Sequence, residues 1–331
     1  MWLVGPPLFE LSRETGPLNS VAPAQIGLAR PVRAGVSSDR DLHRLLRWEY
    51  HAILDALLDA GTPFRILNLS RAKSAVAKSL RKKGYPSLDL PVEHLGSFST
   101  YPRDLFLYAE AARLLLVHPA CFRMRTRERR GFTMLPSAWA EGGRMVFQGD
   151  RAVLGKHPEM NRLPAPSALN RMRAGGMGIA AIPAAIFVTL GPRGAVQSSH
   201  YEPHIDRYAS LVRDKRGAHV LLLDPGYRSG PLLDPWDVSR SLDAARRACA
   251  RHAIEVRMPP KLGVPYGISL VAVANERYLM SSGDPDTTDW VASIVGRERL
   301  FVTSRPIMHY PVFASAGIHC LVTESPEALV A

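Results

Sequence analysis

A cysteine near the end of the sequence stands among residue types that could activate it. Cys320 lies in SAGIHCLVTES (315–325), directly after a glycine, an isoleucine and a histidine, and it is one of three cysteines in 331 residues. The other two, Cys121 and Cys249, share no C-x-x-C spacing with it, so the spacing of a zinc ribbon is absent. A lone cysteine is either a small apolar core residue or a nucleophile, and its partners elsewhere decide between the two.

Three other short stretches combine acidic or imidazole side chains with turn-forming residues. YPRDLF contains Arg103 and Asp104, AEGGRMVF contains Glu141, and PHIDRY contains His204 and Asp206. Residues two apart on an extended segment face the same side, so His204 and Asp206 are expected to face one site. A thiol with an imidazole is the minimum for nucleophilic thiol catalysis, and a carboxylate can orient the imidazole. The spare carboxylates suit a guanidinium, which pairs with them through two parallel hydrogen bonds. The residues therefore predict a cysteine enzyme that acts on a guanidino group.

The order R-D, E-G-G, H-x-D and then G-x-H-C resembles the guanidine-modifying (pentein) superfamily. That superfamily includes arginine deiminases, agmatine deiminases, dimethylarginine dimethylaminohydrolases and amidinotransferases. The resemblance extends over roughly residues 30–325. It implies one catalytic domain over residues 1–331 and an α/β fold, the five-bladed α/β propeller, with pseudo-fivefold ββαβ units around a central active site.

The resemblance also implies a role for each motif residue. Cys320 would be the nucleophile and His204 the general acid and base. Glu141 would hydrogen-bond the guanidinium, and Asp104 and Asp206 would bind its nitrogens. The resemblance implies no metal and no cofactor.

The residues that would bind the far end of the substrate are less sharply defined. Arg103, beside the first carboxylate, is counted with the substrate-binding residues. Arginine deiminases hold the α-carboxylate with an arginine after the E-G-G motif, a position that falls near Glu159 here, with Arg162 three residues later. Glu159 would favour an ammonium group and Arg162 a carboxylate. Amidinotransferases and agmatine deiminases usually have threonine two residues after the cysteine, whereas Thr323 is three residues after it.

The leading hypothesis is a deiminase that hydrolyses arginine or an arginine-like compound to a ureido product and ammonia through a covalent thiouronium. An amidinotransferase, which would pass the amidino group to an amine, is the alternative. A binding or regulatory protein on the same scaffold would not need Cys320. A metal-dependent hydrolase could use His200, His204 and Asp206, but further clustered ligands are missing.

Composition sets the wider limits. The sequence is 46% hydrophobic and 22% charged, as in globular proteins, and no apolar run approaches the ~20 residues of a membrane-spanning helix. The odd number of cysteines and the poor secretion signal in MWLVGPP favour the cytoplasm. The formal charge of +12 includes basic clusters at 70–84 and 122–131, which are expected to be solvated faces rather than a nucleic-acid site. The expected partner is a small guanidino substrate, and homo-oligomer formation stays open.

Alternating helices and strands must position these motifs. Apolar residues at three- and four-residue steps predict a helix over 39–60, a basic helix is expected over 70–83, and a third over 239–252 would bury Cys249 as packing. The glycine-rich stretch 174–181 is expected to be a loop. Short apolar runs predict strands at 64–69, 113–118, 144–148, 185–190, 219–224, 254–258, 268–274 and 299–304. This alternation indicates an α/β or α+β fold.

Overall fold

A computed structural model of the chain describes the sequence in separate ranges. These are residues 2–5, 39–69, 82, 84–85, 87–90, 106–117, 133–136, 142–156, 166–183, 186–190, 196–201, 205–224, 235–261, 267–307 and 318–324. Within them strands and helices alternate, as the sequence predicts. No helix in these ranges has both the length and the apolar character needed to cross a membrane.

Four three-stranded sheets share one topology, in which the first two strands are antiparallel and the third is parallel to the second. The first sheets consist of β4 (Phe106–Ala109), β5 (Leu114–Val117) and β6 (Thr133–Pro136), and of β7 (Met145–Gln148), β8 (Arg151–Lys156) and β9 (Gly178–Pro183). The others consist of β12 (Ala209–Arg213), β13 (His219–Leu223) and β14 (Ile254–Arg257), and of β15 (Leu270–Val273), β16 (Arg277–Met280) and β17 (Leu300–Val302).

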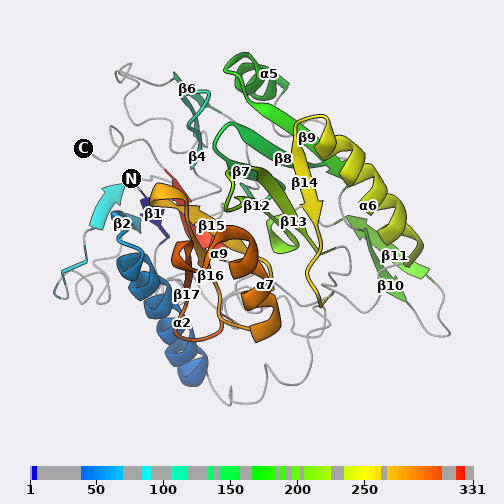
Figure 1. Cartoon of the computed structure of the whole chain (residues 1–331). Coiled ribbons are helices and arrows are strands. Elements are labelled where there is room, and N and C mark those ends of the chain that lie inside the picture. The colour runs from blue at the N-terminus through cyan, green and yellow to red at the C-terminus, as the bar shows by residue number, and fades with distance from the viewer. Residues whose placement is uncertain are drawn as a thin grey trace.

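Parallel neighbours need a long crossover, and in three of these sheets the described crossover contains a helix. The helices are α5 (Pro166–Ala174) before β9, α6 (Pro235–Ala250) before β14 and α7 (Pro285–Val295) before β17. Each of these units therefore has the order strand, strand, helix, strand. In Figure 1 the helices lie at the outside of the sheets, whereas β7, β12 and β15 lie toward the middle.

A fifth sheet joins segments from the two ends of the described sequence. Its order is β18 (Val322–Glu324), β1 (Trp2–Val4), β2 (Phe64–Leu69) and β3 (Ser87–Leu90). β1 is antiparallel to β18 and parallel to β2, and α2 (Asp39–Asp59) connects β1 to β2. A separate antiparallel hairpin is formed by β10 (Ile186–Leu190) and β11 (Val196–Tyr201).

Helix α2 confirms the prediction over 39–60, and its apolar stripe explains why it forms. The stripe packs on β1, β2 and the short helix α9 (Ile318–Leu321), because one face of an amphipathic helix must be removed from water. The helix ends where Gly61 adopts a φ of 58° and donates its N–H to the Leu58 carbonyl at 2.8 Å. Glycine adopts this left-handed conformation without the Cβ clash of other residues. The buried stripe is Leu46, Tyr50, Ile53, Leu54 and Leu57.

The remaining element predictions have mixed outcomes. Each predicted strand is present, with both ends within two residues of the expected bounds. The helix predicted over 239–252 begins earlier, at Pro235. The loop expected over 174–181 is wrong, since β9 begins at Gly178 and pairs with β8. Cys249 is fully buried on α6, and burial raises the pKa of its thiol to about 12, which confirms its packing role. Apart from Lys82, the basic helix over 70–83 lies outside the described residues, as does the cluster at 122–131.

Candidate functional site

Each predicted motif stands just before the first strand of one sheet. Asp104 is two residues before β4, Glu141 immediately precedes the 3-10 turn η3 (Gly142–Arg144) and β7, and His204 immediately precedes η5 (Ile205–Arg207). Cys320 is on α9, which leads directly into β18. In the sequence, each of the four motifs thus directly precedes a strand of a different sheet.

The short segments that join these motifs to their strands touch one another. Helix α9 contacts η3, and η3 in turn contacts η5. The fold therefore brings together the main chain at Cys320, the turn that follows Glu141 and the turn that contains Asp206. Of the predicted site residues, these are the parts that the structure describes.

Asp206 is buried, with 2% of its surface exposed, which costs free energy for a carboxylate unless its charge is compensated. It lies in a 3-10 turn, so the expectation of an extended H-x-D segment is wrong for Ile205 and Asp206. Whether His204 and Asp206 face one site stays a prediction, because His204 lies outside the described residues. For Cys320 the structure describes the main chain of α9. The other predicted site residues lie outside the described ranges: Arg103, Asp104, Glu141, Glu159, Arg162 and His204.

A glycine on β8 determines where the Asp206 turn can sit. A Cβ built on Gly155 would overlap Cγ2 of Ile205 and would also approach the main-chain oxygen of Arg144 at 3.7 Å. Gly155 is therefore the position on β8 at which both η5 and η3 pack against the strand. Because Ile205 is fully buried beside it, any side chain there must displace the turn.

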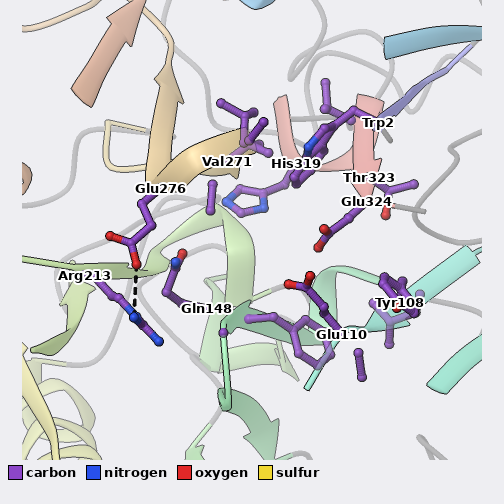
Figure 2. A pocket seen from close by; sticks show the side chains of 18 residues that line it. Trp2, Tyr108, Glu110, Gln148, Arg213, Val271, Glu276, His319, Thr323 and Glu324 are labelled. Carbon is purple, nitrogen blue, oxygen red and sulfur yellow. Dashed lines mark hydrogen bonds and ion pairs between the residues drawn. The ribbon is translucent and has the colours of Figure 1, made fainter. Parts of the chain in front are cut away.

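A cavity of about 400 Å³ opens between the strands that follow the motifs (Figure 2). This volume is in the range of small-molecule sites. β4, β7, β12, β15 and β18 all contribute to its wall, and α9 adds His319, the neighbour of Cys320. The polar and aromatic wall residues are Trp2, Tyr108, Glu110, Phe147, Gln148, Arg213, Glu276, His319, Thr323 and Glu324.

Two carboxylates face each other on one side of this cavity, Glu110 and Glu324 (Figure 2). Burial raises the pKa of Glu324 to about 7, and the nearby Glu110 adds to the shift. The pKa of Tyr108 is also raised, first by burial and then by the two carboxylates. Both shifts arise because a negative charge is less stable in a poorly hydrated place and next to another negative charge.

The opposite side of the cavity is formed by a paired arginine. Arg213 donates to Glu276 at 3.0 Å and lies 3.9 Å from Asp150, so its charge is balanced locally. Glu276 also accepts from Arg299 at 3.2 Å. Its φ of 56° is in the left-handed region, which a residue with a side chain adopts only when its surroundings hold it there.

The cavity residues were not among the sequence predictions. Glu110, Gln148 and Glu324 have no local signature, since they become neighbours only when three separate strands meet. Among the described residues, no group of three or more His, Cys, Asp or Glu side chains is placed to bind a metal ion.

Comparison with known proteins yields matches only to solved structures. No family model matches the chain, and no curated protein does. The structure is similar to a cysteine-to-serine mutant of dimethylarginine dimethylaminohydrolase from Pseudomonas aeruginosa, complexed with citrulline. The two share 12% sequence identity, with a TM-score of 0.50 over 97% of each chain.

Two further structures of dimethylarginine dimethylaminohydrolase are similar at 12% identity. One is an adduct with 4-chloro-2-hydroxymethylpyridine, with a TM-score of 0.45 over 84% of this chain and 90% of that one. The other is a histidine-to-glycine variant bound to S-methyl-L-thiocitrulline, with a TM-score of 0.47 over 97% of each chain. At this identity the match to the citrulline complex concerns the fold alone, which is similar to that of dimethylarginine dimethylaminohydrolase. The resemblance first seen in the motif order is confirmed at that level.

Proposed function

We propose that this chain is a cysteine-dependent hydrolase that deiminates arginine or an arginine-like guanidino compound. The fold supports a guanidine-modifying enzyme of the pentein type. The single observation that supports the assignment to Cys320 is the contact of α9 with η3 and of η3 with η5. Through these contacts, segments far apart in the sequence that each contain or adjoin a motif residue become neighbours. A purely structural cysteine would not require this convergence.

In this proposal the reaction has two steps. The Cys320 thiolate attacks the central carbon of the guanidinium, which Asp104, Asp206 and Glu141 hold by charge-assisted hydrogen bonds. The C–N bond breaks as His204 gives a proton to the departing amine, and a thiouronium remains on sulfur. Water, deprotonated by His204, then adds to the same carbon. The C–S bond breaks and the ureido product leaves with the thiolate restored.

We further propose that the five mixed sheets are the blades of a five-bladed propeller in one catalytic domain. The shared topology of the sheets supports this, as does the contribution of strands from all five to one cavity wall. The tail of the substrate would contact Arg103, Glu159 and Arg162. Because Glu159 favours an ammonium group and the arginines favour a carboxylate, the proposal does not specify the charge of that tail.

Mass spectrometry of acid-quenched protein tests the nucleophile and the substrate class together. Mixing with arginine, agmatine or N-methylated arginines should add an amidino or substituted amidino mass to the peptide that contains Cys320. Cys320→Ser should abolish this adduct. Cys249→Ser is the matched control and should retain it, because Cys249 is buried and its thiol is held protonated.

Product analysis separates hydrolysis from transfer to an amine. Ammonia and a ureido product should form without any added amine. Release of ornithine from arginine only when an acceptor amine is present would instead identify an amidinotransferase. A lack of adduct with every guanidine, in folded protein with Cys320 reduced, would overturn the proposal.

A further inference from the structure

The cavity wall is rich in groups that accept hydrogen bonds. Three carboxylates and one amide line it, against a single guanidinium, that of Arg213. The Arg213 charge is already balanced by Glu276 and Asp150. Among the described residues, no lysine or arginine forms an ion pair with Glu110 or Glu324. The N-terminal ammonium acts on Glu324 and lowers its pKa, but by less than burial and Glu110 raise it. On this side of the cavity two carboxylates therefore face each other against one ammonium of the chain.

Gln148 provides an independent sign of a missing ligand. The residue is only 8% exposed, and its side chain points into the cavity from the end of β7 (Figure 2). Its Oε1 is buried and has no hydrogen-bond partner within the described part of the chain. Leaving a buried acceptor unsatisfied is costly, so such an atom commonly marks the position of a donor that binds there. The strand end is itself held in place, since His219 Nε2 lies 3.1 Å from the Gln148 main-chain oxygen.

Aromatic side chains complete the wall on the acidic side. Trp2 from β1 and Tyr108 from β4 line the same space as Glu110 and Glu324 (Figure 2). The faces of aromatic rings attract cations, and the combination of aromatic rings with carboxylates is suited to an organic cation. A hydrated metal ion would gain nothing from the rings and would find few oxygen ligands here.

We propose that this cavity binds a small organic cation with N–H donors, a primary alkylammonium or a guanidinium group. The charged group would lie between Glu110 and Glu324 and the aromatic rings, with an N–H directed to Gln148 Oε1. An uncharged alcohol lacks the charge, and a quaternary ammonium lacks the donors. Binding of a cation in this cavity does not require a reaction at Cys320. The binding proposal can therefore be tested separately from the proposed function.

Isothermal titration calorimetry at pH 8 with n-butylammonium as the probe tests the proposal. We expect n-butylammonium to bind at least about tenfold more tightly than n-butanol, because a hydrogen bond to a charged group is stronger than a neutral one. Tetramethylammonium should bind more weakly than n-butylammonium. Equal affinity for n-butanol and n-butylammonium would overturn the proposal, as would preferential binding of acetate.

Substitutions of cavity residues test whether the cation binds in this cavity. Glu110→Gln and Glu324→Gln should each weaken n-butylammonium binding about tenfold, and Gln148→Leu should weaken it several-fold. Glu255→Gln, an exposed change outside the cavity, is the matched control and should have no effect. Unchanged affinity in a folded Glu110→Gln, Glu324→Gln double variant would disprove the site.

A variant of the cysteine distinguishes this cavity from the proposed catalytic site. Cys320→Ala should bind n-butylammonium as the unmodified protein does, since the thiol is not among the proposed contacts. Loss of binding in Cys320→Ala would show that the cation occupies the catalytic site instead, which also overturns the proposal.

Discussion

At the residue scale, the carboxylate of Glu324 connects the cavity to the stability of the fold. It lies one residue beyond Thr323 on β18, the strand that follows Cys320. It faces Glu110, which directly follows β4 (Figure 2). Its pKa of about 7 exceeds the 4.5 of a free glutamate, first because of burial and then because of Glu110. Between these two values the folded protein binds a proton that the unfolded chain releases.

This shift predicts a pH dependence of stability with a definite sign. The Glu324 contribution is fully favourable below about pH 4.5 and is lost as the pH rises through about 7. Glu324→Gln should remove this loss. The difference in the free energy of unfolding, variant minus original protein, should therefore be larger at pH 8 than at pH 5. The relative gain should be on the order of 3 kcal/mol. Urea unfolding at both pH values measures it.

Glu255→Gln is the comparison for this experiment. The hydrogen bond from Arg257 lowers the pKa of Glu255, so its contribution changes only below pH 4.5 and should be constant between pH 5 and pH 8. A Glu324→Gln protein whose stability followed that of the original protein at every pH would contradict the prediction.

Individual residues of the candidate site and the cavity differ in how well the sequence could predict them. Cys320 and the motif carboxylates can be chosen from the sequence, because their neighbours form recognisable short patterns. Gln148, Glu110 and Glu324 stand in ordinary strand ends and turns. Their significance depends on which strands meet, and that information is spread over the whole chain.

At the element scale, the short turns before the strands determine the position of the candidate site. The apolar runs predicted eight of the eighteen strands that the structure describes, because strands buried on both faces need apolar side chains on both. β9 is one of the strands that the sequence did not predict, because the glycines at and before its start resemble a loop. Gly178 allows Arg151 to pack closely against the strand. The geometry of the H-x-D segment could not be predicted, since a three-residue turn has no hydrophobic period.

Gly155→Ala tests the role of these turns. The added methyl group would overlap Ile205, which must move together with η5 and Asp206. Overpacking of this kind costs about 1–3 kcal/mol, and we also expect slower adduct formation at Cys320. Denaturant unfolding and quenched mass spectrometry measure the two effects.

Gly283→Ala is the matched control for this substitution. A Cβ at Gly283 meets no atom within 4 Å, so its stability and adduct formation should be unchanged. If Gly155→Ala behaved like Gly283→Ala, η5 would not depend on the close packing at Gly155.

At the scale of the whole molecule, β1 links β2 to the helix that contains Cys320 and to the strand after it, β18. β1 pairs with both β18 and β2, and the Gly5 N–H donates to the Leu321 carbonyl at 2.7 Å. The Tyr50 hydroxyl donates to the Gly5 carbonyl at 2.6 Å in a buried position. No local pattern could predict this pairing, because its partners are separated by most of the sequence.

Tyr50→Phe should therefore destabilise the protein by about 1–2 kcal/mol, because the buried Gly5 carbonyl loses a donor without gaining water. Tyr85→Phe is the control, since its 3.3 Å hydrogen bond to Asp55 is exposed and should contribute less than about 0.5 kcal/mol. Urea unfolding at one pH compares the two. Equal stability of both variants would contradict the importance assigned to this contact.

The pairing of β1 with β18 also has a consequence for synthesis on the ribosome. Domains begin to fold from the part of the chain that emerges first, but β1 cannot gain its second neighbour until residues 322–324 have been made. Until then one edge of β1 stays open, and the turn with Cys320 has no sheet to rest on. The segment that contains Cys320 can thus join this sheet only after β2 and the four three-stranded sheets have been translated.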